Sequence, residues 1–133
     1  MEKKKLPDCP VETTLMLITN RWKVLILRDL FTGTKRFGEL KRSLEGISQK
    51  VLTANLKSME ADGLLTRRAY AEVPPRVEYT LTELGESLRP VIAAMFDWGV
   101  DYGKRNGVTT DEARLNALDA ALHGMDMTKA PTE

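Results

Sequence analysis

Cysteine and histidine are nearly absent from this 133-residue chain, which contains one of each. A single cysteine cannot form an intrachain disulfide, and one cysteine with one histidine cannot build a conventional Cys/His zinc site. We therefore expect no structural metal and no cofactor.

Long apolar runs are also missing. No window approaches the roughly 18 uninterrupted apolar residues that are needed to cross a bilayer. The basic N-terminus is followed by a segment that contains Glu12, Thr13 and Thr14, so it lacks the apolar centre of a secretory signal. These absences predict a cytoplasmic protein.

The residue types used in catalysis form no recognisable pattern. The sequence contains no Ser/His/Asp set, no paired carboxylates in a familiar frame and no glycine-rich phosphate loop. We therefore expect that the protein is not an enzyme. It also lacks internal repeats and Ser/Gly-rich linkers, and its length fits one compact unit with an appendage.

The formal net charge of +1 conceals an uneven distribution. Residues 21–76 carry twelve Lys or Arg against six Asp or Glu, whereas residues 77–133 carry five against ten. A basic middle and an acidic end indicate one face suited to a polyanion, although solvated charges distributed by chance would give the same totals.

Four helices are predicted in the first half of the chain. The first begins with a proline, which the first helical position tolerates, and covers 10–19. Residues 22–31 carry a wide apolar stripe typical of a central core helix, and residues 37–44 carry a shorter one. The fourth helix spans 48–62, with Ser48 as its N-cap.

The helix 48–62 has two different sides. At 100° per residue, Leu52, Leu56 and Met59 fall together on one side. The opposite side contains two cations, no acid and otherwise small or polar residues: Lys50, Thr53, Ala54, Lys57 and Ser58, with Gln49 in the exposed first turn.

The pattern then changes to alternation, which predicts two antiparallel strands within 64–82. Their connection contains Pro74 and Pro75, which cannot donate ladder hydrogen bonds, so the tip should be a stiff projecting turn. Arg76 is expected at this tip, and Arg67 and Arg68 on the incoming strand.

A heptad seam follows at Leu84, Leu88, Val91, Met95, Trp98 and Tyr102. Pro90 should kink or divide this helix, because proline removes a backbone hydrogen bond. Ile92, Phe96 and Val100 add a second apolar stripe, so the helix has more apolar surface than one small domain covers easily. A partner would bury the excess; burial within the chain's own core is the alternative.

Several ordered motifs between Cys9 and Tyr102 carry a family resemblance: CPV, RWKVLILRDL, RFGEL, GIS followed by VLT, MEADGL, and EVPPRVEYTLTELG. The chain resembles the HxlR-type bacterial transcription regulators, which are related to the MarR type. The resemblance implies a mainly α fold with a small β-hairpin wing, a winged helix-turn-helix. We expect this domain, with its dimerisation helices at about 9–19 and 83–105, to occupy residues 1–106, and an add-on helix and tail to occupy 107–133.

The resemblance implies a DNA-binding surface centred on the helix 48–62. A helix in the major groove can read base edges, and the candidates are Gln49, Lys50, Thr53 and Asn55. The candidates for the DNA backbone and the wing contacts are Lys35, Arg36, Lys41, Arg42, Ser48, Lys57, Arg67, Arg68 and Arg76.

The resemblance also implies a homodimer that reads a palindromic operator in double-stranded DNA. The candidates for dimerisation are Leu15, Leu88, Val91, Met95, Trp98 and Tyr102.

Cys9 is the candidate for regulation. It is expected at the N-cap before Pro10, where the helix dipole would lower the pKa of the thiol, whereas the adjacent Asp8 would oppose this effect. Some relatives sense oxidants or electrophiles through a cysteine in this CPV position. The alternatives are a small residue packed at the dimer interface and control by a small-molecule effector. The lone His123 is expected on the surface.

The leading hypothesis is therefore a dimeric, sequence-specific transcription regulator. The alternative is a winged-helix module that contacts other proteins and has no affinity for DNA.

Overall fold

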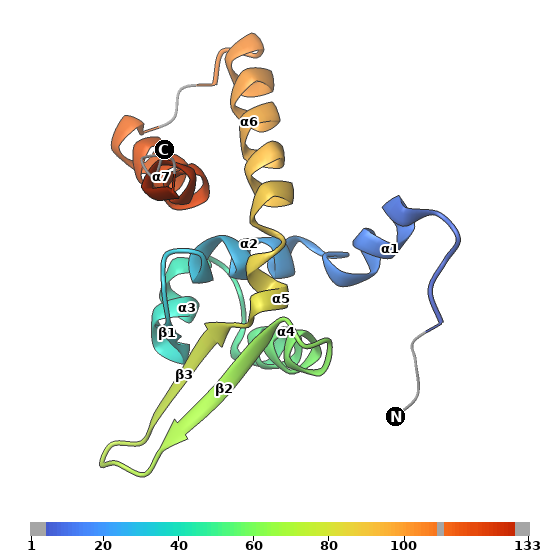
Figure 1. Ribbon diagram of the computed structural model, residues 1–133. Coiled ribbons are helices and arrows are strands. Elements are labelled where there is room, and N and C mark those ends of the chain that lie inside the picture. Colours follow the sequence, from blue (N-terminus) through green and yellow to red (C-terminus); the bar gives the residue numbers. More distant parts are fainter. Residues whose placement is uncertain (1–4, 109–110, 130–133) are drawn as a thin grey trace.

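The computed structural model describes residues 5–108 and 111–129 of the chain, and the side chains of these residues as far as Gly124. Most of the described residues are helical, and a small antiparallel sheet completes the fold (Figure 1). In chain order the elements are α1 (Pro10–Leu17), α2 (Arg21–Leu30), β1 (Lys35–Arg36), α3 (Phe37–Ser43), α4 (Gln49–Ala61), β2 (Leu65–Tyr70), β3 (Arg76–Leu81), α5 (Glu83–Glu86), α6 (Arg89–Arg105) and α7 (Glu112–Lys129). This order confirms the predicted winged helix-turn-helix.

The core forms where α2 meets α3, α4 and the sheet. Ile26, Leu27 and Leu30 of α2 are buried at its centre. The apolar sides of the neighbouring elements close over them, as the helical periodicity requires: Leu40, Leu44, Ile47, Leu52, Leu56, Met59, Leu64, Leu65 and Tyr79.

The helix α4 begins where the sequence predicts. The Ser48 side chain accepts a hydrogen bond from the Val51 backbone N–H at 3.1 Å, which satisfies one of the free donors of the first turn. Its apolar side is buried against α2, and the Lys23 ammonium of α2 donates to the Ser58 hydroxyl at 2.9 Å. The core therefore fixes which side of α4 faces outward.

The sheet has the order β1-β3-β2. The hairpin β2–β3 is the predicted one, with Leu65 opposite Leu81 and Tyr70 opposite Arg76. The third strand, β1, was not predicted, because two residues carry no periodic signal. It is a strand only because it pairs with β3, with Lys35 opposite Tyr79. We call β2, β3 and their connecting turn the wing.

The long helix predicted after the wing is divided in two, as expected from its proline. The short helix α5 ends before α6, and Pro90 occupies the first turn of α6. The α5 backbone lies close to the start of β2: a Cβ added to Gly85 would stand 2.2 Å from the Leu64 carbonyl oxygen. Glycine is needed at this position because any side chain would collide with that backbone.

The helices α1 and α6 extend away from the rest of the molecule, and α7 lies beside α6 (Figure 1). Leu122 of α7 is only 4% exposed and joins the core. The Arg89 guanidinium of α6 donates to the backbone carbonyls of Ala121 and Phe31, so it connects α6 to both α7 and the end of α2. Among the described residues, no helix combines the length and the hydropathy of a membrane span.

Candidate nucleic-acid interface

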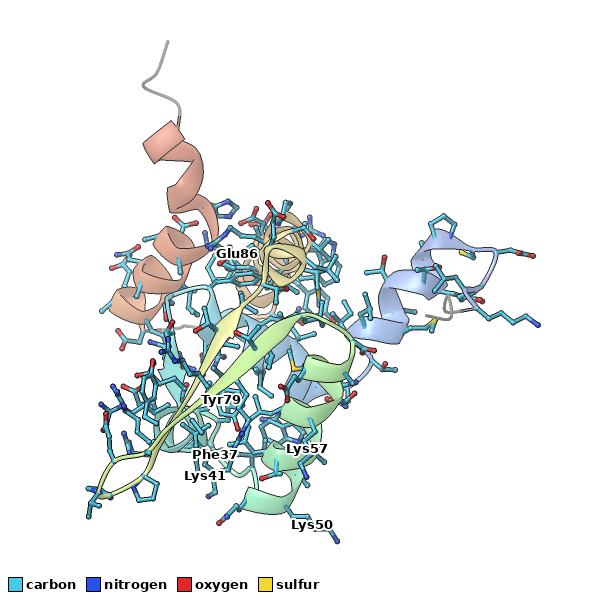
Figure 2. All side chains as sticks on the ribbon, turned by 60° about the horizontal axis from the view of Figure 1, so that its bottom comes forward. Phe37, Lys41, Lys50, Lys57, Tyr79 and Glu86 are labelled. Carbon is cyan, nitrogen blue, oxygen red and sulfur yellow. The ribbon has the colours of Figure 1, made fainter. Side chains whose placement is uncertain are left out.

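The outward side of α4 matches the predicted composition. Gln49, Lys50 and Lys57 are exposed, and Thr53 is half-buried. Figure 2 shows Lys50 and Lys57 along α4 and Lys41 on the neighbouring α3, whereas Glu86 lies apart from them at the α5–α6 end. The protein therefore presents a helix whose outward side carries side-chain donors and acceptors and positive charge.

Asn55 was expected to read bases, and the structure corrects this expectation. Asn55 is 8% exposed, its amide nitrogen donates to the Val51 carbonyl at 2.9 Å, and its Oδ1 accepts from the Asn20 side chain at 3.0 Å. Asn20 also caps α2 by accepting from the Lys23 backbone N–H. The two amides hold the start of α2 against α4, so neither oxygen nor nitrogen of Asn55 faces a ligand.

A second group of cations lies beside α4, on β1 and α3. Arg36, Lys41 and Arg42 are exposed and Lys35 is half-buried. Because β1 pairs with the wing and α3 precedes the turn into α4, these residues lie next to the helix that would enter a groove. This is the arrangement in which lysine and arginine side chains can pair with phosphates on both sides of a docked helix.

One carboxylate lies within this cationic group. Glu39 of α3 accepts a hydrogen bond from the Arg36 backbone N–H at 2.8 Å and so caps the N-terminus of α3. That bond lowers the pKa of the Glu39 carboxyl, and the charges of Lys35, Arg36 and Arg42 lower it further. Glu39 was not singled out from the sequence, because a capping box is usually signalled by Ser or Thr at the N-cap and here that position is Arg36.

The wing contributes exposed cations from β2. Arg67 lies opposite Tyr79 in the sheet and lines an open hollow between the wing and α4 together with Gln49, Thr53 and Lys57. Arg68 is exposed, with its guanidinium 4.8 Å from the centre of the Tyr70 ring. Predicted base-reading and wing residues thus share one surface, which α4 and β2 form together.

Arg76 lies at the tip end of the wing as expected, opposite Tyr70, but its guanidinium is paired within the wing. Its guanidinium donates to Glu72 at 2.8 Å and to Glu78 at 3.1 Å, and it lies 3.8 Å from the centre of the Tyr70 ring. Only 24% of the side chain is exposed. Arg76 therefore joins the two wing strands internally, and two carboxylates neutralise its charge.

The predicted dimerisation residues fall into two groups. Leu88 is 9% exposed and Val91 is packed against the core, so these two belong to the chain's own interior. Four others are exposed: Leu15 of α1 and Met95, Trp98 and Tyr102 of α6. The Trp98 and Tyr102 rings stack with centres 5.1 Å apart, and Trp98 is 68% exposed. We call these four residues, which lie on the two separate helices α1 and α6, the exposed apolar patch.

Cys9 lies at the predicted N-cap of α1. Its backbone carbonyl accepts from the Thr13 N–H at 3.1 Å, whereas its side chain makes no capping hydrogen bond. The thiol is exposed and is not part of a disulfide. It is therefore accessible to a reagent in solution, and it lies on the helix that carries Leu15 of the exposed apolar patch.

The family profile described as "HxlR-like helix-turn-helix" matches residues 17–107. An HTH-type transcriptional regulator of Bacillus subtilis (strain 168), YdeP, is 48% identical over 118 residues, which cover 89% of this chain and 85% of YdeP. Two solved structures of the redox regulator HypR are also similar. The oxidised form gives a TM-score of 0.66 at 44% identity over 70% of this chain and 96% of HypR. The reduced form gives 0.68 at 42% identity over 72% and 94%.

Proposed function

Because the chain belongs to the HxlR-like helix-turn-helix family of transcriptional regulators, we propose that it binds a palindromic operator as a homodimer and reads it through α4. The relatives are named as transcriptional regulators and not as enzymes, so they give no support to an enzymatic role. The observation that carries the proposal is the outward side of α4, which has no acid before Glu60 and has cations of α3 and β2 on its flanks.

The proposed roles follow the exposure of each side chain. Lys50, Gln49 and Thr53 lie at the end of α4 that would enter the major groove, where base edges present distinguishable donors and acceptors. The DNA backbone would be held by Lys35, Arg36, Lys41, Arg42, Ser48, Lys57, Arg67 and Arg68. We omit Asn55 and Arg76 from these sets because their polar groups are used within the fold.

Dimerisation is proposed through the exposed apolar patch. One reading helix contacts few base pairs, and two copies related by a twofold axis would contact half-sites about 34 Å apart or a multiple of it. An aromatic pair exposed on α6 is suited to an interface, since aromatic residues are enriched there.

Control of the regulator is proposed at Cys9. HypR, whose structure is similar, is a redox regulator solved in an oxidised and a reduced form. The exposed Cys9 thiol on α1 could change the dimer on oxidation, which a single cysteine per chain restricts to an interchain disulfide, a mixed disulfide or a sulfenic acid. A small-molecule effector is the alternative means of control.

The proposal is tested by DNA selection followed by binding measurements at several salt concentrations. Binding should weaken with salt by a logarithmic slope of about −0.9 per neutralised phosphate. A protein-interaction module would instead show no DNA affinity even at low salt.

Two lysines of α4 serve as a matched pair in the same assay. Lys50→Ala should reduce discrimination among operator variants by about 1–3 kcal/mol, whereas Lys57→Ala should weaken all sequences alike and reduce the salt slope by about 1. If both variants weaken every sequence equally, the assignment of the base-reading end of α4 is wrong.

A further inference from the structure

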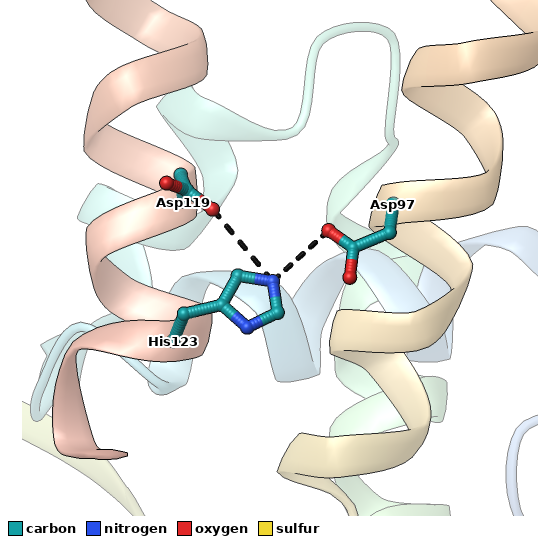
Figure 3. Close-up of side chains that lie close together, drawn as sticks. All are labelled: Asp97, Asp119 and His123. Carbon is teal, nitrogen blue, oxygen red and sulfur yellow. Dashed lines mark hydrogen bonds and ion pairs between the residues drawn. The ribbon is translucent and has the colours of Figure 1, made fainter. Parts of the chain in front are cut away.

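The helix α7 lies beyond residues 17–107, the part of the chain that the family profile matches. Where α7 packs beside α6, Asp97 of α6 meets Asp119 and His123 of α7 (Figure 3). The three side chains place one potential ligand atom each within 4.8 Å of the others. We propose that Asp97, Asp119 and His123 form a binding site for a divalent transition-metal ion that fastens α7 to α6.

The distances suit coordination. The His123 Nε2 atom lies 3.0 Å from Asp97 Oδ1 and 3.6 Å from Asp119 Oδ1. Metal–ligand bonds of about 2.0–2.2 Å in a tetrahedral arrangement separate neighbouring ligand atoms by about 3.3 Å. These two separations lie on either side of this value, and the two carboxylates lie within 4.8 Å of each other, so side-chain rotation must bring the three ligand atoms together around an ion.

A metal cation between the three side chains could contact all of them at once, which a proton on His123 Nε2 cannot do. Both carboxylates face the same nitrogen, Nε2 of His123, as the dashed lines of Figure 3 show. A single N–H on that nitrogen points well toward only one acceptor. A divalent ion would be coordinated by the lone pair of this nitrogen and by one oxygen of each carboxylate.

The surroundings contain charges of both signs. Asp101 and Glu112 line the same α6–α7 groove, and Lys104 lies there with them. Arg89 lines the neighbouring hollow beside His123, but its guanidinium is paired with the Glu86 carboxylate and with backbone carbonyls. This arginine is therefore committed to other partners.

The α7 backbone that carries His123 is anchored without an ion, whereas the Asp97 and Asp119 side chains are 58% and 59% exposed. Leu122 is buried in the core, and Arg89 donates to the carbonyl of Ala121, so the α7 backbone next to His123 is anchored on two sides. Asp119 and His123 are four residues apart and share one face of the helix. The anchored backbone lowers the ordering cost of binding.

The ligand set indicates the class of ion. One imidazole with two carboxylates suits first-row transition ions such as Zn²⁺, whereas Ca²⁺ and Mg²⁺ prefer oxygen ligands alone. The cluster is open to solvent, which gives an ion a path of entry and leaves room for water as a further ligand. A single histidine excludes a Cys/His zinc site but not this carboxylate-rich one.

The experiment is a calorimetric titration of the untagged full chain with ZnCl₂. One ion per chain should bind saturably. Asp97→Asn, Asp119→Asn and His123→Ala should each weaken binding by at least about tenfold, since even outer-sphere partners of metal sites contribute about 10- to 100-fold. Asp101→Asn, on the same groove, and Cys9→Ser are the matched controls and should bind as the wild type does.

A second measurement uses the wild-type chain and therefore does not depend on how variants fold. Since the chain has one histidine, its imidazole C–H signals in a proton NMR spectrum belong to His123. They should shift with Zn²⁺ and broaden with paramagnetic Co²⁺. Absence of saturation at millimolar zinc, unchanged histidine signals, or loss of binding in Cys9→Ser would overturn the site. None of these readouts involves DNA, so they are independent of the proposed function.

Discussion

Among single residues, several polar side chains that were expected to contact DNA make hydrogen bonds within the fold instead. Asn55 and Asn20 bond to each other across α2 and α4, and Arg76 is held between Glu72 and Glu78. Hydrogen bonds within the fold engage both polar atoms of Asn55 and two of the three guanidinium nitrogens of Arg76, whose Nε has no partner among the described residues. A group whose donors and acceptors are satisfied inside the protein gains nothing from turning toward a ligand.

Asn55→Ala is expected to lower the free energy of unfolding by about 1–3 kcal/mol, because the Asn20 amide would lose its acceptor in a partly buried position. Asn20→Ala should cost more, since it also removes the cap of α2. Urea unfolding measures both changes. DNA affinity per folded molecule should stay at the wild-type value in Asn55→Ala; a change in base preference would restore Asn55 to the reading surface.

Cys9 is the residue on which the redox proposal depends. Diamide should release the wild-type protein from its operator, and a thiol reductant should restore binding, whereas Cys9→Ser should remain bound throughout. Fluorescence anisotropy follows the release, and non-reducing electrophoresis identifies an interchain disulfide. Release of Cys9→Ser by diamide would show that the thiol is not the switch.

Among the elements, the close approach of α5 to the start of the first wing strand determines how the helix α6 leaves the domain. Thr82 caps α5 by accepting from the Gly85 backbone N–H, and its hydroxyl donates to the Gly63 carbonyl. Gly85 then lets α5 lie directly on the backbone of Leu64. The direction of α6 is set by this contact, since α6 follows α5 after only two residues.

Gly85→Ala is therefore expected to destabilise the fold by about 1–3 kcal/mol, because the added methyl group would collide with the Leu64 carbonyl and force the backbones apart. The matched control is Gly124→Ala in α7, where nothing lies within 4 Å of the added carbon. That change should stabilise the helix by about 0.5–1 kcal/mol. Thermal and urea unfolding compare the two; equal stability of both variants would contradict the close approach.

For the molecule as a whole, α1 and the far end of α6 extend away from the core, although Ile92 and Ala93 at the start of α6 are buried and α7 packs beside α6 (Figure 1). No residue of α1 is buried, and the aromatic pair of α6 remains open to solvent. Exposing such residues costs roughly 25 cal/mol per Å² of apolar surface, which association of two chains would recover. The oligomeric state is thus the property most directly tied to these two helices.

Trp98→Glu should convert a dimer into a monomer at micromolar concentration, because a carboxylate would be buried without a partner in the centre of the proposed interface. Sedimentation velocity measures the change. Val73→Glu is the control, since Val73 is fully exposed in the turn of the wing, and the wing and α6 point to opposite ends of the molecule (Figure 1). A wild-type protein that sediments as a monomer, or a Trp98→Glu protein that remains dimeric, would reject this interface.

The elements that could be predicted from the amino-acid sequence are those whose signals are local. The Ser48 cap, the two-sided helix after it, the proline-tipped hairpin and the break at Pro90 all depend on residues a few positions apart, and each lies where it was predicted. Helical and strand periodicities operate over such short separations, so they can be read without knowledge of the fold.

Which of these side chains remain available to a ligand depends on the packing of the folded chain. Asn55 and Leu88 are enclosed by elements distant in sequence, and the two-residue strand β1 exists because β3 lies beside it. Asp97 and His123 are 26 positions apart and meet because α7 folds back on α6. Burial and long-range proximity arise from how whole elements pack, and no short window of the sequence contains that information.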